Sequence, residues 1–215
     1  IPDSIVTDVK PMLLPGDVLV VRKEHALTNY FLPGYWPHAA LHIGTPAQLS
    51  ELGIDISDHG AKRWPLITQA ASLQGHCVLE AMKDGVRLRC LQSPLASDSF
   101  VVLRPQLTAE KVGQGLARVL GHEGKGYDFD FDFGRSDRLV CTEVVYRAFD
   151  GLGQTPIQLQ RRAGRPTLAG ADLVQMAVDG SCFDPVAAYI PARANELVTG
   201  DAARAAIRAA LESIG

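Results

Sequence analysis

The sequence predicts a single α+β domain covering all 215 residues. Short apolar segments of strand length alternate along the chain with segments whose apolar residues recur at helical spacing. No internal repeat and no linker divides the chain, so one domain over residues 1–215 is the economical interpretation. Hydrophobic residues make up 47% and charged residues 21%, a composition that lets a chain of this length bury an ordinary core.

The first elements are a strand at 17–22 and a loop at 30–37 that is rich in aromatic residues and proline. A helix is expected to begin after Thr45, because a threonine cap, a proline in the first turn and Gln48 together form a capping box. Gly53 ends this helix. The segment that follows is harder to assign, although a helix fits residues 64–73.

The second half of the chain continues the alternation of strands and helices. Phe100 to Leu103 form an apolar run typical of a buried strand, and Thr108 then caps a helix that Gly121 stops. The remaining expected elements are a strand at 156–160, a helix at 168–178, a strand at 183–189 and an alanine-rich helix at 201–214.

Residues 77–82 and 86–91 predict a β-hairpin joined by an Asp-Gly turn. In the simplest register Cys77 and Cys90 face opposite sides of this hairpin, whereas a β-bulge would let them pair. We favour free thiols at both positions and at Cys182, since a chain of this size needs no disulfide.

Cys141 begins a short amphipathic helix, which is the most informative feature of the chain. Val144 with Ala148 and Val145 with Phe149 repeat at helical spacing and would dock the helix on a core. The free N–H groups and the helix dipole at such a start stabilise negative charge, so a thiol there can become a nucleophile. The alternative is that Cys141 is a small buried hydrophobic residue.

Two upstream segments supply the partners that a thiol nucleophile needs. Residues 36–44 alternate, with Ala39, Leu41 and Ile43 on one face and His38, Ala40 and His42 on the other. Glu80 lies in the middle of an apolar strand, where a buried carboxylate needs a compensating partner such as an imidazole. The alternative is that Glu80 lies on the solvated face of an edge strand.

In the order His, Glu, Cys these segments resemble the circularly permuted, YiiX-like branch of the NlpC-type papain-like cysteine hydrolases. The resemblance begins with Pro-Gly-Asp at 15–17 and continues through the segments 37–44, 78–86, 127–131 and 139–146. It implies a permuted papain-like fold in which an antiparallel sheet packs against helices, including the helix of the nucleophile. The segment at about 45–75 resembles an insertion.

The resemblance implies a role for each matching residue. Cys141 would be the nucleophile, His38 the general base and acid, and Glu80 the group that orients the imidazole. His42 has no catalytic counterpart in the family and is expected to be a neighbour on the strand, although it is the next base to examine if Glu80 is remote from His38. Thr142 stands where serine often follows the family's cysteine.

Tyr127 is a candidate for contact with the substrate or the oxyanion, because the tract that it begins leads to the cysteine helix. The alternation of aspartate and phenylalanine over 128–133 invites a calcium interpretation, but EF-hand spacing would put the loop glycine at Phe133 and the bidentate glutamate at Leu139. We therefore expect a strand or edge with one buried face.

The remaining histidines lack the spacing of metal ligands and are expected to be surface residues. They are His25, His59, His76 and His122.

Composition excludes some classes of protein. The net charge of −3 and the lack of a long basic stripe argue against nucleic-acid binding. No apolar run reaches the roughly 20 residues that span a bilayer. The chain begins at Ile1 without methionine, so a signal peptide, lipid anchor or upstream domain could have been removed, and the compartment, cell envelope or cytoplasm, cannot be read.

The expected activity is hydrolysis of an amide in a peptide or an N-acylated amino compound through a thioester, without metal or organic cofactor. One alternative is a thiol-dependent acyltransferase or lipid esterase of the lecithin:retinol acyltransferase-like type, which the aromatic loop at Tyr30 to Trp36 could serve by binding an acyl chain. Another is a catalytically silent binding module. The expected partner is accordingly a small peptide, amide or acyl substrate.

Overall fold

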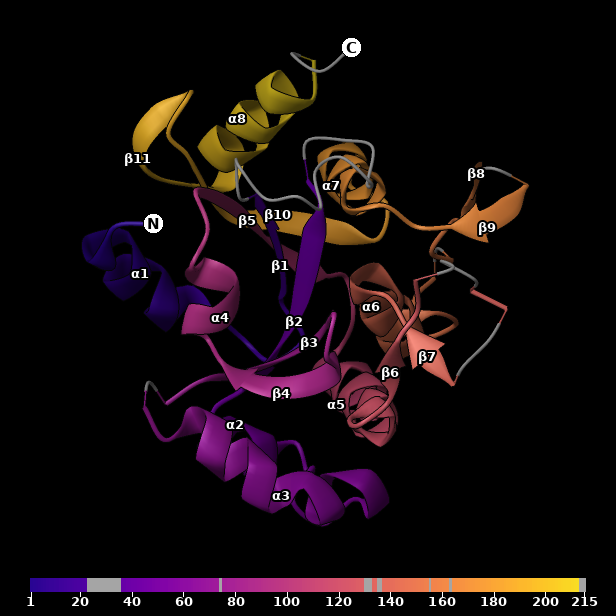
Figure 1. Ribbon diagram of the computed structural model, residues 1–215. Helices are drawn as coiled ribbons and strands as arrows, with labels where there is room; N and C mark the ends of the chain where they lie inside the picture. Colours follow the sequence, from indigo (N-terminus) through magenta and orange to yellow (C-terminus); the bar gives the residue numbers. More distant parts are fainter. Residues whose placement is uncertain are drawn as a thin grey trace.

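An antiparallel sheet of seven strands forms the centre of the computed structural model, in the order β11-β10-β5-β1-β2-β3-β4 (Figure 1). Its strands are β1 (Val18–Arg22), β2 (His38–Gly44), β3 (Cys77–Met82), β4 (Gly85–Cys90), β5 (Ser99–Pro105), β10 (Phe183–Ile190) and β11 (Ala194–Thr199). Residues 1–22, 36–73, 75–129, 133–134, 137–154, 156–162 and 164–212 are described by the structure.

Helices and two small strand pairs surround this sheet. The helices are α1 (Asp3–Val9), α2 (Pro46–Glu51), α3 (Asp58–Ala71), α4 (Gln92–Leu95), α5 (Ala109–Val119), α6 (Cys141–Phe149), α7 (Gly170–Asp179) and α8 (Gly200–Glu212), with 3₁₀ turns at Lys10–Met12 and Leu120–His122. The small pairs are parallel β6 (Gly126–Tyr127) with β7 (Arg138–Leu139) and antiparallel β8 (Gln160–Arg162) with β9 (Arg165–Thr167).

The sheet has a hydrophobic core on each face, because successive residues of a strand point to opposite sides. Val18 and Val20 of β1 belong to the larger core, whereas Leu19 and Val21 belong to the smaller one. Helices α2, α3, α5, α6, α7 and α8 contribute buried side chains to the larger core, and α1 and α4 contribute to the smaller. Figure 1 shows α1 and α4 together on one side, away from α5 and α6.

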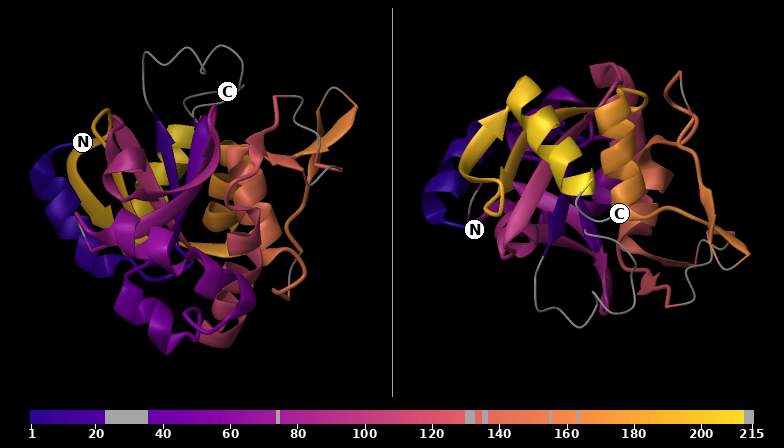
Figure 2. Two further views of the ribbon diagram at one scale, coloured as in Figure 1. Left: turned by 60° about the horizontal axis from the view of Figure 1, so that its bottom comes forward. Right: turned by 90° about the horizontal axis from the view of Figure 1, so that it is seen from above.

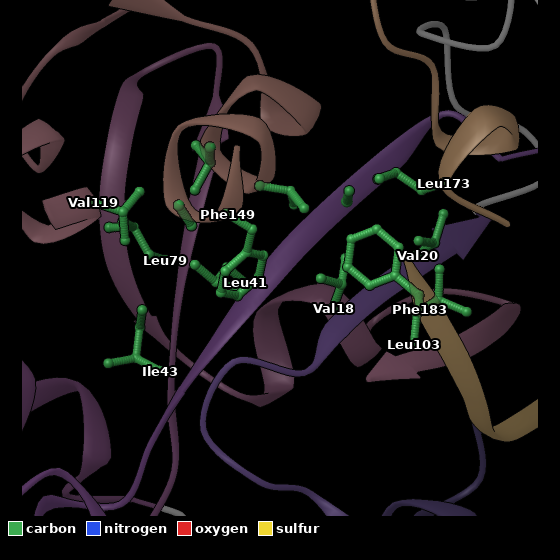
Figure 3. Packing of buried hydrophobic residues seen from close by; sticks show 14 of the residues in the cluster. Val18, Val20, Leu41, Ile43, Leu79, Leu103, Val119, Phe149, Leu173 and Phe183 are labelled. Atoms are coloured by element: carbon green, nitrogen blue, oxygen red, sulfur yellow. The ribbon is translucent and has the colours of Figure 1, made fainter. Parts of the chain in front are cut away.

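The larger core is continuous from the cysteine helix to the C-terminal helices. Figure 3 shows Phe149 of α6, Leu173 of α7 and Phe183 of β10 within it. Helices α7 and α8 contact each other over the same face, as the two views of Figure 2 show. The helix that carries Cys141 is therefore held against the sheet by ordinary apolar packing.

Several expected elements are confirmed. Thr45 and Gln48 form the capping box of α2, and the Thr108 side chain accepts a hydrogen bond from the backbone N–H of Lys111 at the start of α5. The predicted face alternation of the strand 38–44 also holds, since Leu41 lies in the larger core and Ala40 in the smaller one.

The predicted starts of one helix and one strand were wrong. Helix α3 begins at Asp58 rather than near residue 64, because the Ser57 side chain caps it by accepting a hydrogen bond from the N–H of Gly60. The strand expected at 156–160 begins only at Gln160, where β8 pairs with β9. The segment 45–75, which resembles an insertion, holds α2 and α3.

The hairpin β3–β4 has a register that the sequence analysis did not expect. Met82 pairs with Gly85, so the loop is Lys83–Asp84 and Gly85 follows it with φ of 97°. This register makes Cys77 and Cys90 direct cross-strand partners, so the expectation that they face opposite sides was wrong. Cys77 and Cys90 nevertheless form no disulfide, and neither does Cys182.

Asp128 and Phe129, the described residues directly after Tyr127, do not form the strand that the alternation suggested. Asp128 is buried and Phe129 is exposed, the reverse of an edge that buries its phenylalanines. Residues 130–132 of this tract lie outside the described residues, as do His25 and residues 30–35 of the aromatic loop. Trp36, which ends that loop, is buried.

Within the described part of the chain, no helix combines the length and apolar character that crossing a membrane requires.

The Pro-Gly-Asp segment directly precedes β1 and is hydrogen-bonded to the histidine strand β2. Asp17 is fully buried and receives hydrogen bonds from the backbone N–H of Leu14 and from the guanidinium of Arg104 at 2.7 and 2.8 Å. Gly16 donates its N–H to the carbonyl of His42 at 2.8 Å. This small network anchors the far end of the strand that His38 begins.

Gly16→Ala is expected to destabilise the protein by about 2–4 kcal/mol. Gly16 has φ of 91°, and a Cβ there would lie 2.7 Å from a methyl carbon of Val112. Gly53 is the matched control, since it has φ of 68° with open space around it, so Gly53→Ala measures backbone strain alone at about 1 kcal/mol. Urea denaturation measures both, and equal losses would exclude the steric contact.

Candidate active site

Cys141 is the first residue of α6. Val140 precedes the helix in an extended conformation, and Val144, Val145 and Ala148 are fully buried against the sheet. The thiol consequently lies at the helix N-terminus, where free backbone N–H groups favour an anion. Only 4% of Cys141 is exposed.

His38 lies beside this thiol. It is the first residue of β2, and its side chain is 24% exposed. Its Nε2 lies 2.7 Å from Oε2 of Glu80, and the side chain of Cys141 lies within interaction range of its ring. Because Nε2 serves Glu80, Nδ1 is the nitrogen left for the thiol. The structure thus brings together the three residues that the sequence analysis selected.

The electrostatics of the group favour a thiolate–imidazolium pair. Burial opposes a charged imidazole, but hydrogen bonds and charges from Cys141 and Glu80 outweigh it and raise the pKa of His38 to about 10. Burial likewise opposes a thiolate, yet His38 and the backbone N–H groups of Ala39 and Thr142 lower the pKa of Cys141. Between those two pKa values the sulfur is negative and the ring positive.

Glu80 occupies the middle of β3 and is 1% exposed, so the alternative of a solvated edge position was wrong. One carboxylate oxygen faces His38. The other accepts a hydrogen bond from the hydroxyl of Ser93 and lies 3.2 Å from Nε of Arg89. Burial raises the pKa of Glu80, but His38, Ser93 and Arg89 together hold it below its usual value.

Tyr127 of β6 lies within electrostatic reach of the thiol. Burial, the charge of Cys141 and the charge of Asp128 all raise the pKa of Tyr127, so its hydroxyl stays protonated. Its ring makes an edge contact with Phe129 at a centroid distance of 4.9 Å. A protonated hydroxyl close to Cys141 is able to donate a hydrogen bond there.

His42 is separate from this group. It is fully buried, with Nδ1 2.8 Å from the carbonyl of Leu14 and Nε2 3.0 Å from Nδ1 of His76. Both ring nitrogens are therefore engaged, and burial lowers the pKa of His42 to about 4. His76, expected on the surface, is half-buried because it makes this contact, and His122 is half-buried beside Lys125. His59 is exposed as expected.

Ser93 and Arg89 are the site residues that the sequence analysis missed. Ser93 lies in the four-residue helix α4, which is too short to show helical periodicity. Arg89 could have been predicted only from the correct hairpin register, which places it diagonally across from Glu80 on the same face of the sheet. Among the described residues, no group of three or more His, Cys, Asp or Glu side chains is placed to hold a metal ion.

Comparison with known proteins finds one family model that matches most of the chain. Residues 12–171 match the model of a family described as permuted papain-like amidase enzymes, YaeF/YiiX, C92 family. The chain is also similar to a solved structure described as the metalloprotein YiiX from Escherichia coli O157:H7, with 20% identity, a TM-score of 0.48, and coverage of 88% of this chain and 90% of that one. No curated protein matches it.

Proposed function

The chain belongs to the family of permuted papain-like amidases, and from this premise we propose that it hydrolyses an amide through an acyl-enzyme on Cys141. Membership confirms the resemblance seen in the sequence and the permuted papain-like fold expected from it. Membership in an amidase family supports enzymatic activity and argues against a catalytically silent binding module. The observation that carries the proposal is the chain of contacts from Glu80 through His38 to Cys141, with Glu80 and His38 2.7 Å apart.

In the first half of the proposed reaction, the thiolate of Cys141 attacks the carbonyl carbon of the amide. A C–S bond forms and the carbonyl oxygen takes the negative charge, which in this proposal the backbone N–H of Cys141 and the hydroxyl of Tyr127 stabilise. When the C–N bond breaks, the imidazolium of His38 gives its proton to the leaving amine. The product is a thioester and a neutral imidazole.

In the second half, water replaces the amine. His38 takes a proton from the water molecule while the oxygen of that water attacks the thioester carbonyl. The C–S bond then breaks, which releases a carboxylic acid and restores the thiolate. Glu80 holds the ring so that one nitrogen faces the sulfur throughout, and its charge stabilises each imidazolium. The proposed substrate is a peptide or an N-acylated amino compound.

Intact-mass detection of an acyl adduct tests this function and identifies the acyl donor. The protein is incubated with cell-wall peptides, simple amides and phospholipids, and Cys141→Ala serves as the control. An adduct from a peptide or amide that maps to Cys141 supports the proposal. An adduct from phospholipid alone would replace it with a lipid esterase or acyltransferase, and no adduct with any donor would favour the silent binding module.

Glu80→Gln is expected to slow turnover by about tenfold to a thousandfold. The amide oxygen still accepts a hydrogen bond from His38, but it no longer stabilises the imidazolium. Glu123→Gln is a matched control, because Glu123 is a largely buried carboxylate that pairs with Arg63 at 3.0 Å instead of with a histidine. Steady-state kinetics measures both variants, and a Glu80→Ala variant as active as the parent would remove Glu80 from the mechanism.

A further inference from the structure

The carboxylate of Glu80 is held at both of its oxygens. Oε2 lies 2.7 Å from Nε2 of His38, and Oε1 is occupied separately by Ser93 and Arg89. A carboxylate with only one partner could turn about its terminal bond and exchange its oxygens. Contacts at both oxygens remove that freedom, so Oε2 stays directed at the imidazole.

The two groups at Oε1 come from consecutive elements of the chain. Arg89 belongs to β4, the partner strand of β3, and Ser93 belongs to α4, which follows β4 directly. Arg89 is itself fixed, because its Nη2 bonds both oxygens of Asp84 at 2.7 and 2.8 Å. The hairpin that carries Glu80 thus also supplies the means to hold it.

Burial makes these contacts consequential. Glu80 is 1% exposed, and a charged group removed from water is costly unless other groups compensate it. Ser93 donates a hydrogen bond without adding charge, and Arg89 brings a positive charge. Removing either partner would leave Oε1 with less compensation in a site where water has little access.

We propose that Ser93 and Arg89 are positioning residues that keep Glu80 ionised and directed at His38, and so maintain the charged pair of His38 and Cys141. This inference rests on the proposed function, because it assigns these residues a purpose only if that pair performs the chemistry. Among the described contacts, those of Ser93 and Arg89 go to Glu80 and Asp84 and not to the sulfur of Cys141. Both act through Glu80.

The charged groups around Glu80 come from three neighbouring elements. His38 faces it from β2 and Arg89 from β4, with Cys141 of α6 beyond the imidazole. Asp84 bears on it only through Arg89. Arg87 is the direct cross-strand partner of Glu80, but its guanidinium bonds the carbonyl of Val86 and lies 3.9 Å from Glu123.

The test measures iodoacetamide alkylation of Cys141 against pH, which requires no substrate. Ser93→Ala and Arg89→Gln are each expected to lower the rate at pH 6 by about threefold to tenfold and to move the profile to higher pH, because a weaker Glu80 stabilises less imidazolium. Ser93→Thr, which keeps the hydroxyl, is expected to restore the parent profile. Arg87→Gln and Ser97→Ala are matched controls that leave Glu80 untouched.

The outcomes separate this inference from the proposed function. A parent protein whose Cys141 reacts no faster than Cys90 at pH 6 would overturn the function itself. A reactive parent with unchanged profiles in Ser93→Ala and Arg89→Gln, or with equal shifts in the controls, would overturn the positioning role alone. Circular dichroism checks folding, and if Ser93→Ala does not fold, Arg89→Gln and Ser93→Thr carry the test.

Discussion

Cys141→Ala is expected to abolish turnover and to leave the fold intact. No other group among the described residues of the site is expected to replace the sulfur as nucleophile, so the rate should fall to the background rate, by about a thousandfold or more. The variant removes one sulfur atom at the end of α6, while the helix remains docked through Val144, Val145 and Ala148. Product formation and thermal unfolding measure the two halves of this expectation.

Two further variants make the result interpretable. Cys141→Ser keeps nearly the same volume and is expected to be as inactive as Cys141→Ala, because His38 does not make a serine hydroxyl a comparable anion. Cys90→Ala removes a partly exposed thiol in β4 and is expected to retain activity. Turnover by Cys141→Ala above background would exclude Cys141 as the nucleophile.

The alkylation rate of Cys141 is expected to be high well below neutral pH. A thiol of ordinary pKa, about 8.5, is only roughly 0.3% ionised at pH 6. His38 and two backbone N–H groups lower the pKa of Cys141, so its thiolate population should already be large there. We expect Cys141 to react at least about tenfold faster than the other cysteines at pH 6. Iodoacetamide labelling with peptide mapping measures each thiol separately.

The three other thiols serve as internal controls. Burial raises the pKa of Cys77 to about 12 and also raises the pKa of Cys182, so both should remain slow at neutral pH. Cys90 and Cys182 are partly exposed whereas Cys141 is buried, so exposure alone would favour alkylation of Cys90 and Cys182 over Cys141. A rapid reaction of Cys141 therefore reports activation of the thiol and not access.

His38→Ala is expected to move the Cys141 profile towards that of an ordinary thiol, because the imidazolium is lost while the helix N-terminus remains. In the parent, alkylation should rise as pH increases through the lowered pKa of Cys141 and then stay high. Turnover should instead fall as pH rises through about 10, where His38 loses the proton that the leaving amine needs. A Cys141 profile indifferent to His38 would remove the histidine from the mechanism.

The site was predictable from sequence where a residue's chemistry and its local pattern agreed. Cys141 stands at a helix start, and Glu80 is a carboxylate inside an apolar strand that needs a partner. Ser93 gave no such signal, because a serine in a short turn of helix is ordinary until the carboxylate that it bonds is known. The misjudged register of β3 and β4 hid Arg89 and also the pairing of Cys77 with Cys90.

The sequence by itself determined the α+β class, the strand that begins at His38, the cysteine helix and the helix caps at Thr45 and Thr108, since these depend on periodicity and contacts between near neighbours. Only the tertiary structure decided that Glu80 is buried, that His42 is engaged by His76, and that Asp128 turns inward. These features depend on contacts between strands and helices far apart in the chain, where a shift of one residue in register moves a side chain to the opposite face.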